Sequence, residues 1–206
     1  NYGCTEFMYV FSLFAMWLQK ISNDSEVIIG VPVAGRPTKD SLDVVGYCTH
    51  LIPVVIPDCK KSVLKEAVIE IRSRLLNSYE NQQIPYSKIR ELLDLRSKSI
   101  DKDPLISVIF NFDEPGDLDQ LDDVEVKWLP VSSGYTAYDL TCNFTVNNGN
   151  YYLDLVFQSD RVSSDLAANL GNGFVTFVKN SIDSSNVRIS EIDTASKEDL
   201  TKQAML

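Results

Sequence analysis

The sequence of 206 residues is poor in the residues that usually mark a metal or hydrolase site. It has one histidine, His50, and its four cysteines, Cys4, Cys48, Cys59 and Cys142, form no CxxC pair. We therefore expect no zinc site, because too few ligands are available. With no signal peptide in view, the cysteines are interpreted as reduced thiols that pack as small buried hydrophobic side chains. The GxSxG, HExxH and P-loop motifs are also absent.

Positive charge and long apolar runs are scarce as well. The chain has 19 basic and 29 acidic residues, for a net charge of -10, whereas phosphate binding needs a basic surface. The apolar stretch 7–18, interrupted only by Ser12, is too short to cross about 30 Å of hydrocarbon. We predict neither a nucleic-acid nor a membrane partner, and a cytoplasmic location. Such an apolar helix needs partners on every face, so the sequence is expected to begin inside a fold.

The pattern of apolar residues predicts an α/β fold with a mixed β-sheet flanked by helices. Helical spacing is found at residues 5–21, 60–77, 86–95 and 163–181. Strands are predicted at residues 26–33, 51–56, 105–112, 124–131, 137–146 and 151–158. The turn sequence Asn-Asn-Gly-Asn at 147–150 predicts a hairpin between the last two strands. Residues 34–43 are interpreted as a loop, and so are residues 113–125, which carry seven acids and lack EF-hand spacing.

Several local features follow from residue types. Pro53 places its strand at an edge or a bulge, and Pro85 is expected in the first turn of a helix. Glu70 and Arg74 have the i,i+4 spacing of a favourable ion pair. Ser163 is expected to cap the last helix. Asp139 is interpreted as a structural partner in an ion pair or hydrogen bond.

Residue chemistry alone leaves the function open, but several segments in order resemble motifs of nonribosomal peptide synthetase condensation domains. Residues 27–36 (VIIGVPVAGR) resemble "DIVVGTPVAGR", and residues 45–54 (VGYCTHLIPV) resemble "IGFFVNTLPLR". Residues 81–89 (NQQIPYSKI) are similar to "HQDLPFEKLV", and residues 101–110 (DKDPLISVIF) to "SRNPLFQVMF". Residues 138–141 (YDLT) fit "FDLTL", and residues 188–193 (RISEID) resemble the linker that leads to an adenylation domain.

The resemblance implies a chloramphenicol-acetyltransferase-like fold, built from two similar subdomains around a tunnel. Residues 1–182 would be the C-terminal subdomain, and residues 183–206 a linker toward an adenylation domain. The implied partners are the N-terminal condensation subdomain, peptidyl carrier proteins and the adjacent adenylation domain. No cofactor would be bound directly, because the substrates arrive on the phosphopantetheine arms of the carriers. The implied activity is amide-bond formation between aminoacyl and peptidyl thioesters in secondary metabolite biosynthesis.

The catalytic signature of the family, HHxxxDG, does not occur in this chain. In the family its histidine is thought to position or deprotonate the attacking amine. No residue of this chain can be given that role by motif, and the chain alone is predicted to be inactive. Two explanations stay open: a subdomain of a full synthetase, or a split or degenerate homologue that binds carriers or recruits tailoring enzymes without catalysis. A stand-alone acyltransferase is a third, which the adenylation-type linker disfavours.

The substrate-contacting residues implied by the resemblance each have a structural alternative. His50, at the position of the family's Asn in "VNT", would face the tunnel with Thr49, or be a hydrogen-bonded histidine at a strand start. Arg36 would touch a phosphopantetheine arm, or pair with a carboxylate beside the turn residue Gly35. A further group would line the tunnel or form a plain loop between strands: Ser132, Ser133 and Tyr135.

Overall fold

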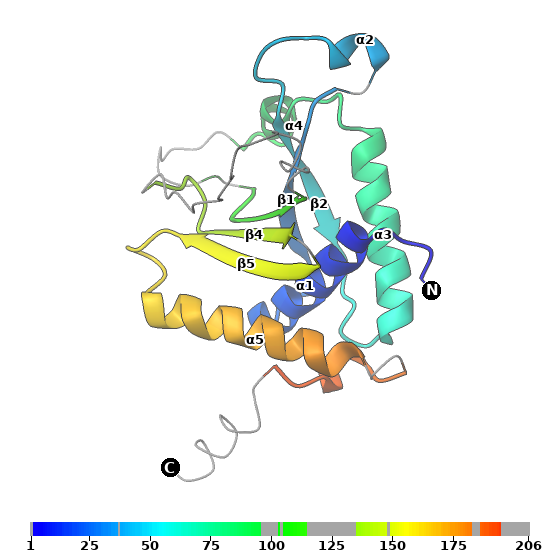
Figure 1. Ribbon diagram of the computed structural model, residues 1–206, viewed down its shortest axis with the longest axis vertical. Coiled ribbons are helices and arrows are strands. Elements are labelled where there is room, and N and C mark those ends of the chain that lie inside the picture. Colours follow the sequence, from blue (N-terminus) through cyan, green and yellow to red (C-terminus); the bar gives the residue numbers. More distant parts are fainter. Residues whose placement is uncertain are drawn as a thin grey trace, which may run out of the picture.

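The structure, a computed structural model, describes residues 2–36, 38–95, 103, 105–114, 135–147, 149–182 and 186–194. In these residues a five-stranded mixed sheet is flanked by helices, in the strand order β2-β1-β3-β4-β5 (Figure 1). The strands are β1 (Val27–Val33), β2 (His50–Ile56), β3 (Val108–Asp113), β4 (Leu140–Asn147) and β5 (Asn150–Phe157). β1, β3 and β4 are parallel, and β2 and β5 run antiparallel at the two edges. The predicted fold class is confirmed.

The strand predictions that fall on described residues hold within a few residues at each end. Pro53 lies in the edge strand β2, as expected, and β4 pairs with β5 through the predicted hairpin. The predicted strand 124–131 and most of the predicted acidic loop 113–125 lie outside the described residues.

The longer helices are α1 (Glu6–Ser22), α3 (Leu64–Glu80) and α5 (Ser164–Ile182), and α1 packs between the other two (Figure 1). Short elements are α2 (Lys39–Leu42), α4 (Tyr86–Leu92) and the 3₁₀ turn η2 (Ile189–Glu191). Two predictions were wrong in detail. α2 interrupts the loop predicted at 34–43, and α3 begins four residues late because Ser62 closes a turn onto the carbonyl of Cys59. Pro85 is the N-cap residue that precedes α4, one position before the predicted first turn. As predicted, the Ser163 hydroxyl caps α5.

α1 lies in the centre of the hydrophobic core, as its apolar sequence predicts. Phe11 and Phe14 are at most 1% exposed, and their rings lie 5.6 and 5.1 Å from that of Phe110 on β3. On β1, Ile29 and Val31 are buried in the same core. Side chains alternate across a strand, so Gly30 faces away from these helices. A Cβ at Gly30 would lie 2.8 Å from the Ile106 side chain, so the segment before β3 covers this second face.

The described part of the predicted linker, residues 186–194, packs on the body of the domain. Ile189 and Ile192 are at most 3% exposed. The Ile189 and Ser190 amides donate to the carbonyls of Ser62 and Lys60, and Lys20 donates to the carbonyl of Ser190. The domain boundary at residue 182 stays a prediction, but this stretch is held by backbone pairing that its polar composition does not reveal.

All four cysteines carry free thiols, but only two are buried as predicted. Cys59 and Cys142 lie in the core, whereas Cys4 and Cys48 are half-buried. Burial raises the pKa of Cys59 to about 11, with smaller contributions from nearby charges, and burial also raises the pKa of Cys142. The two buried thiols are therefore protonated and unreactive at neutral pH.

Candidate functional site

The parallel strands β1, β3 and β4 end at the same edge of the sheet, where ligands bind in many α/β proteins. Val33, the last residue of β1, pairs with His50, the first residue of β2. The intervening loop therefore leaves and re-enters the sheet at this edge. The structure thus brings together three of the predicted site residues: Arg36, Thr49 and His50.

The His50 ring is half-buried and both of its nitrogens face backbone carbonyls. Nε2 lies 2.7 Å from the Gln82 oxygen, and Nδ1 lies 3.3 Å from the Cys48 oxygen. Carbonyl oxygens only accept hydrogen bonds, so the short contact makes Nε2 a donor to Gln82. The ring thus links the start of β2 to the segment between α3 and α4. This geometry matches the structural alternative for His50, and a substrate contact stays a prediction.

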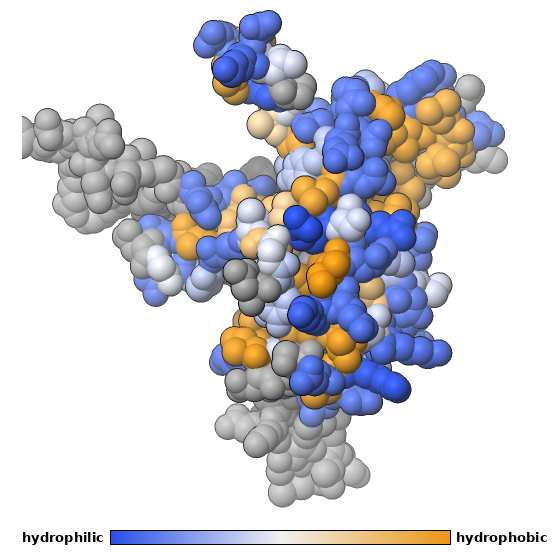
Figure 2. Space-filling view, turned by 90° about the vertical axis from the view of Figure 1, so that its right-hand side faces the viewer, coloured by the Kyte–Doolittle hydropathy of each residue, from blue (hydrophilic) through white to orange (hydrophobic). Residues whose placement is uncertain are grey.

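Arg36 forms its hydrogen bonds within the loop that follows it. Its guanidinium donates to the carbonyl oxygens of Ser41, Val44 and Gly46, at 2.7, 2.6 and 3.2 Å. The predicted pairing with a carboxylate is therefore replaced by a three-carbonyl clamp, because the loop folds back over the side chain. The clamp holds a loop of residues 38–47, which projects from the body at the top of the molecule (Figures 1 and 2). Most of its surface is hydrophilic, and it is named the apolar loop here for its four exposed hydrophobic side chains.

The apolar loop exposes large hydrophobic side chains that a monomer normally buries. Val45 is 101% exposed and Tyr47 is 90% exposed, and Leu42 and Val44 are also exposed. Of the remaining predicted site residues, Thr49 and Tyr135 are exposed, whereas Ser132 and Ser133 lie outside the described residues.

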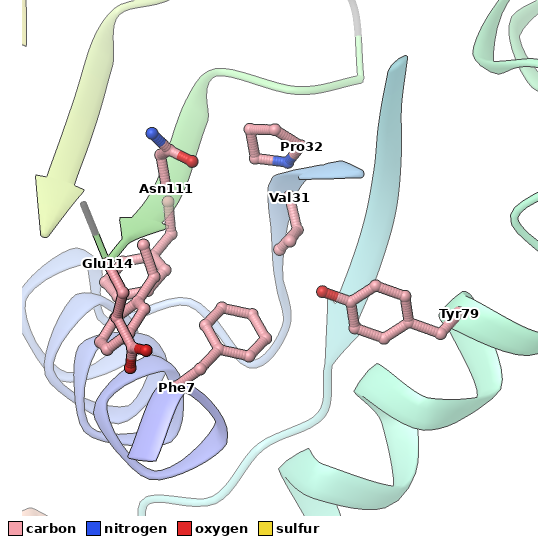
Figure 3. Close-up of a pocket in the computed structure, with 8 residues that line it drawn as sticks. Phe7, Val31, Pro32, Tyr79, Asn111 and Glu114 are labelled. Carbon is pink, nitrogen blue, oxygen red and sulfur yellow. The ribbon is translucent and has the colours of Figure 1, made fainter. Parts of the chain in front are cut away.

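A pocket of about 360 Å³ opens between α1, the end of α3 and the ends of β1 and β3 (Figure 3). The sequence did not predict it, because its residues come from separate segments and most of them were interpreted as core. The one available signal was Asn111, a polar residue in an apolar strand. The lining residues are mostly apolar: Phe7, Val31, Pro32, Tyr79, Phe110, Asn111, Phe112 and Glu114.

A polar cluster holds α4 against the segment before β3. Oδ1 of Asp103 accepts hydrogen bonds from the Tyr86 hydroxyl and, at 2.9 Å each, from the Leu105 and Ile106 amides. Arg90 approaches its other oxygen to 3.7 Å. Burial favours a raised pKa for Asp103, but these hydrogen bonds and the Arg90 charge outweigh burial and lower it. Burial, followed by the contact with Asp103, raises the pKa of Tyr86.

Two predicted ion pairs are present. Arg74 lies 2.8 Å from Glu70 on α3, and Arg161 lies 2.7 Å from Asp139, which confirms the structural role predicted for Asp139. Within the described residues, no three His, Cys, Asp or Glu side chains gather in a way that could hold a metal ion. No helix in the described part of the chain combines the length and hydropathy needed to cross a membrane.

Comparison with known proteins gives consistent matches. A family model described as "Condensation domain" matches residues 1–206. Gramicidin S synthase 2 of Aneurinibacillus migulanus is 24% identical over 99% of this chain and 5% of its own length. Tyrocidine synthase 3 of Brevibacillus parabrevis is 21% identical over 95% of this chain and 3% of its own length.

Solved structures agree on the fold. A four-domain nonribosomal peptide synthetase bound to AMP and glycine superposes with a TM-score of 0.84 at 20% identity, covering 94% of this chain and 16% of that one. The X-domain from teicoplanin biosynthesis, in complex with OxyB, gives a TM-score of 0.80 at 20% identity, covering 95% and 44%. The chain thus spans less than half of each of these relatives. With a family match over the whole chain and the same fold in these structures, the chain belongs to the condensation-domain family of nonribosomal peptide synthetases.

Proposed function

We propose that this chain is the C-terminal half of a nonribosomal peptide synthetase condensation domain and forms one wall of its substrate tunnel. One observation carries the proposal. The family model matches the whole chain, and yet the chain covers only 44% of the X-domain and 43% of the first condensation domain of the CDA synthetase. A second half is therefore needed to complete the fold that these structures share.

The proposed reaction joins two thioesters carried on phosphopantetheine arms. The amine of the acceptor attacks the donor carbonyl and a C–N bond forms. The C–S bond breaks, and the proton lost by the amine balances the one gained by the departing thiolate, which leaves as the free thiol of the donor arm. A group that positions the amine or takes its proton must lie within hydrogen-bond reach. The single histidine of this chain has both ring nitrogens on carbonyl oxygens. We assign the catalytic group to the other half.

The apolar loop supports a contact with that other half. Four large hydrophobic side chains are exposed together on this loop, and contiguous exposed apolar surface marks interaction sites. The Arg36 clamp keeps the loop ordered before any partner binds, which lowers the entropy cost of association. The remaining proposed partners are peptidyl carrier proteins and an adenylation domain, in a cytoplasmic assembly line.

The test compares product formation by the chain alone and by the chain with the missing half supplied in trans. Both are given carrier proteins loaded with donor and acceptor, and the amide product is measured by mass spectrometry. We expect no product from the chain alone and product from the pair. The other half with its HHxxxDG histidine changed to alanine serves as the control. Turnover by the chain alone at the rate of an intact domain would refute the proposal.

A second candidate is a non-catalytic condensation-like module that binds carriers or recruits a tailoring enzyme. The observation that favours this second candidate is the likeness to the teicoplanin X-domain, whose structure was solved in complex with OxyB. The two candidates differ upstream of this chain. An intact HHxxxDG motif with product formation supports catalysis, whereas a degenerate motif with carrier binding and no product supports the module.

A further inference from the structure

The pocket at the ends of β1 and β3 has aromatic walls. The Phe7 ring projects from the first turn of α1, and it lies 5.7 Å from the Phe112 ring and 6.5 Å from the Tyr79 ring, edge to face in both cases (Figure 3). Val31 and Pro32 of β1 close the side toward the sheet. Aromatic rings in offset and edge-to-face arrangements accept a further ring or a branched aliphatic group readily.

Two polar groups give this pocket a direction. The Tyr79 hydroxyl points into the space between Val31 and Phe7 (Figure 3). It makes no hydrogen bond with the described residues, and burial raises its pKa, so it stays a neutral donor at physiological pH. Glu114 is the one charged residue among the lining residues, and it is exposed to solvent. The pocket thus combines apolar walls, an inward hydroxyl and a carboxylate on its solvent side.

We propose that this pocket binds an aminoacyl group with a large apolar or aromatic side chain and a free α-amine. The side chain packs among Phe7, Phe112 and Val31, the ammonium pairs with Glu114, and the Tyr79 hydroxyl donates to the carbonyl. The inference rests on the proposed function, since it takes an aminoacyl thioester as the ligand, and it adds which aminoacyl groups the chain selects.

Size and charge restrict the occupant. A volume of about 360 Å³ is within the usual range for small-molecule sites, so a glycyl group leaves most of the pocket empty. Glu114 and the net charge of -10 disfavour an anionic side chain. An N-acylated residue carries no ammonium and loses the charge-assisted contact with Glu114. The pocket therefore distinguishes a free aminoacyl group from a blocked one.

The test measures binding of three stable probes to the full-length protein that carries this chain. The probes are phenylalanyl, N-acetylphenylalanyl and glycyl amides of aminopantetheine, in which an amide replaces the reactive thioester. Dissociation constants are determined by titration calorimetry or by ligand-observed NMR. We expect the phenylalanyl probe to bind about 10-fold more tightly than the glycyl probe, as expected for a buried ring.

Variants identify the groups. Glu114→Gln should weaken binding of the phenylalanyl probe about 5-fold and leave binding of the N-acetylphenylalanyl probe unchanged. Glu66→Gln, an equal charge change near the other end of α3, should alter neither probe. Tyr79→Phe keeps the ring and should weaken both probes by a similar factor. Glu114 is exposed and Tyr79→Phe removes only one oxygen, so both variants should fold, which a thermal melt verifies.

Equal binding of the phenylalanyl and glycyl probes overturns the inference, and so does an equal effect of Glu114→Gln on the free and acetylated probes. Amide formation from loaded carriers is measured on the same variants. If condensation proceeds and Glu114→Gln leaves the preference among acceptor aminoacyl groups unchanged, the pocket inference fails while the proposed function stands. If the probes bind as expected and no condensation occurs with the complete protein, the proposed function fails instead.

Discussion

The Tyr86 hydroxyl donates a hydrogen bond to Oδ1 of Asp103, which joins α4 to the segment that enters β3. The two condensation motifs that resemble these segments have Phe and Asn at the corresponding places. Tyr86 and Asp103 are therefore a matched pair of departures, since a phenol and a carboxylate form a contact that Phe and Asn cannot. The Asp103 side chain is 12% exposed, so solvent replaces this contact poorly.

We expect the two residues to be energetically coupled. Tyr86→Phe and Asp103→Asn should each lower the free energy of unfolding by about 1–2 kcal/mol, because a hydrogen bond to a charged group is lost. The double variant should lose about 1 kcal/mol less than the sum of the two. Urea unfolding of the four proteins measures the coupling. Additive losses would show that the contact contributes nothing as a pair.

The same contact predicts a dependence on pH. The pKa of Asp103 is lowered in the folded protein, below the ordinary carboxyl value of 3.8. The stabilisation is therefore fully present above about pH 4 and is lost as pH falls through the lower folded value. The difference in unfolding free energy between the parent and Asp103→Asn should be largest near pH 7 and shrink toward pH 2. A difference that grew on acidification would contradict the assignment.

Substitutions of His50 should mainly change the free energy of unfolding. His50→Leu leaves the Gln82 carbonyl without its ring donor and should cost about 1–3 kcal/mol. His50→Asn restores a side-chain donor, and it is also the residue of the similar motif, so it should cost less. In the complete enzyme, His50→Asn is expected to keep most of the amide-forming activity. If His50→Leu unfolds like the parent and yet loses acceptor use, the ring contacts substrate.

Gly35 and Gly149 form a matched pair for testing the close approach of the site loop. Their φ angles are 65° and 73°, but a Cβ would lie 2.0 Å from the Cys48 oxygen at Gly35 and meet nothing within 4 Å at Gly149. Gly149→Ala should cost about 1–2 kcal/mol from backbone strain alone. Gly35→Ala should cost at least about 3 kcal/mol, because the peptide next to His50 must also move. Chemical denaturation of both variants gives the comparison.

The apolar loop should drive self-association when the other half is absent. Val45→Ser with Tyr47→Ser should shift the chain toward the monomer in analytical ultracentrifugation, with a change in unfolding free energy of at most about 0.5 kcal/mol, since neither side chain is buried. Leu166→Ser on α5, also exposed, is the control and should leave association unchanged. Equal association of the parent and the double variant would place the contact elsewhere.

The sequence predicted those elements whose formation depends on residues close to one another in the chain. The apolar periodicity identified α1 and α5, and the turn residues at 147–150 identified the β4–β5 hairpin. Features that depend on distant partners were missed. Val63, just before α3, pairs with Arg188 in an isolated bridge, and the sequence around residue 60 does not reveal this distant partner.

The candidate site was predicted in part for the same reason. The order of motifs brought Arg36, Thr49 and His50 to one edge, because they flank a single loop. The carbonyl partners of Arg36 and His50 depend on how that loop folds back, which residue types do not specify. The pocket needs Phe7, Tyr79 and Phe112 from three elements at once. Their hydrophobic character predicted burial, and only the assembled fold shows that they line a pocket.

Residues 186–194 are held against the body of the domain, which fixes the point from which any following part of a longer polypeptide would leave it. Asn180 on α5 donates to the carbonyl of Asp193, which ties the end of the described segment to the last turns of that helix. If the held residues 186–194 were free to extend, they would add about 30 Å of contour length. A domain joined downstream would therefore be connected by a shorter flexible linker that begins beside α5. The volume that this domain could reach would be smaller as a result.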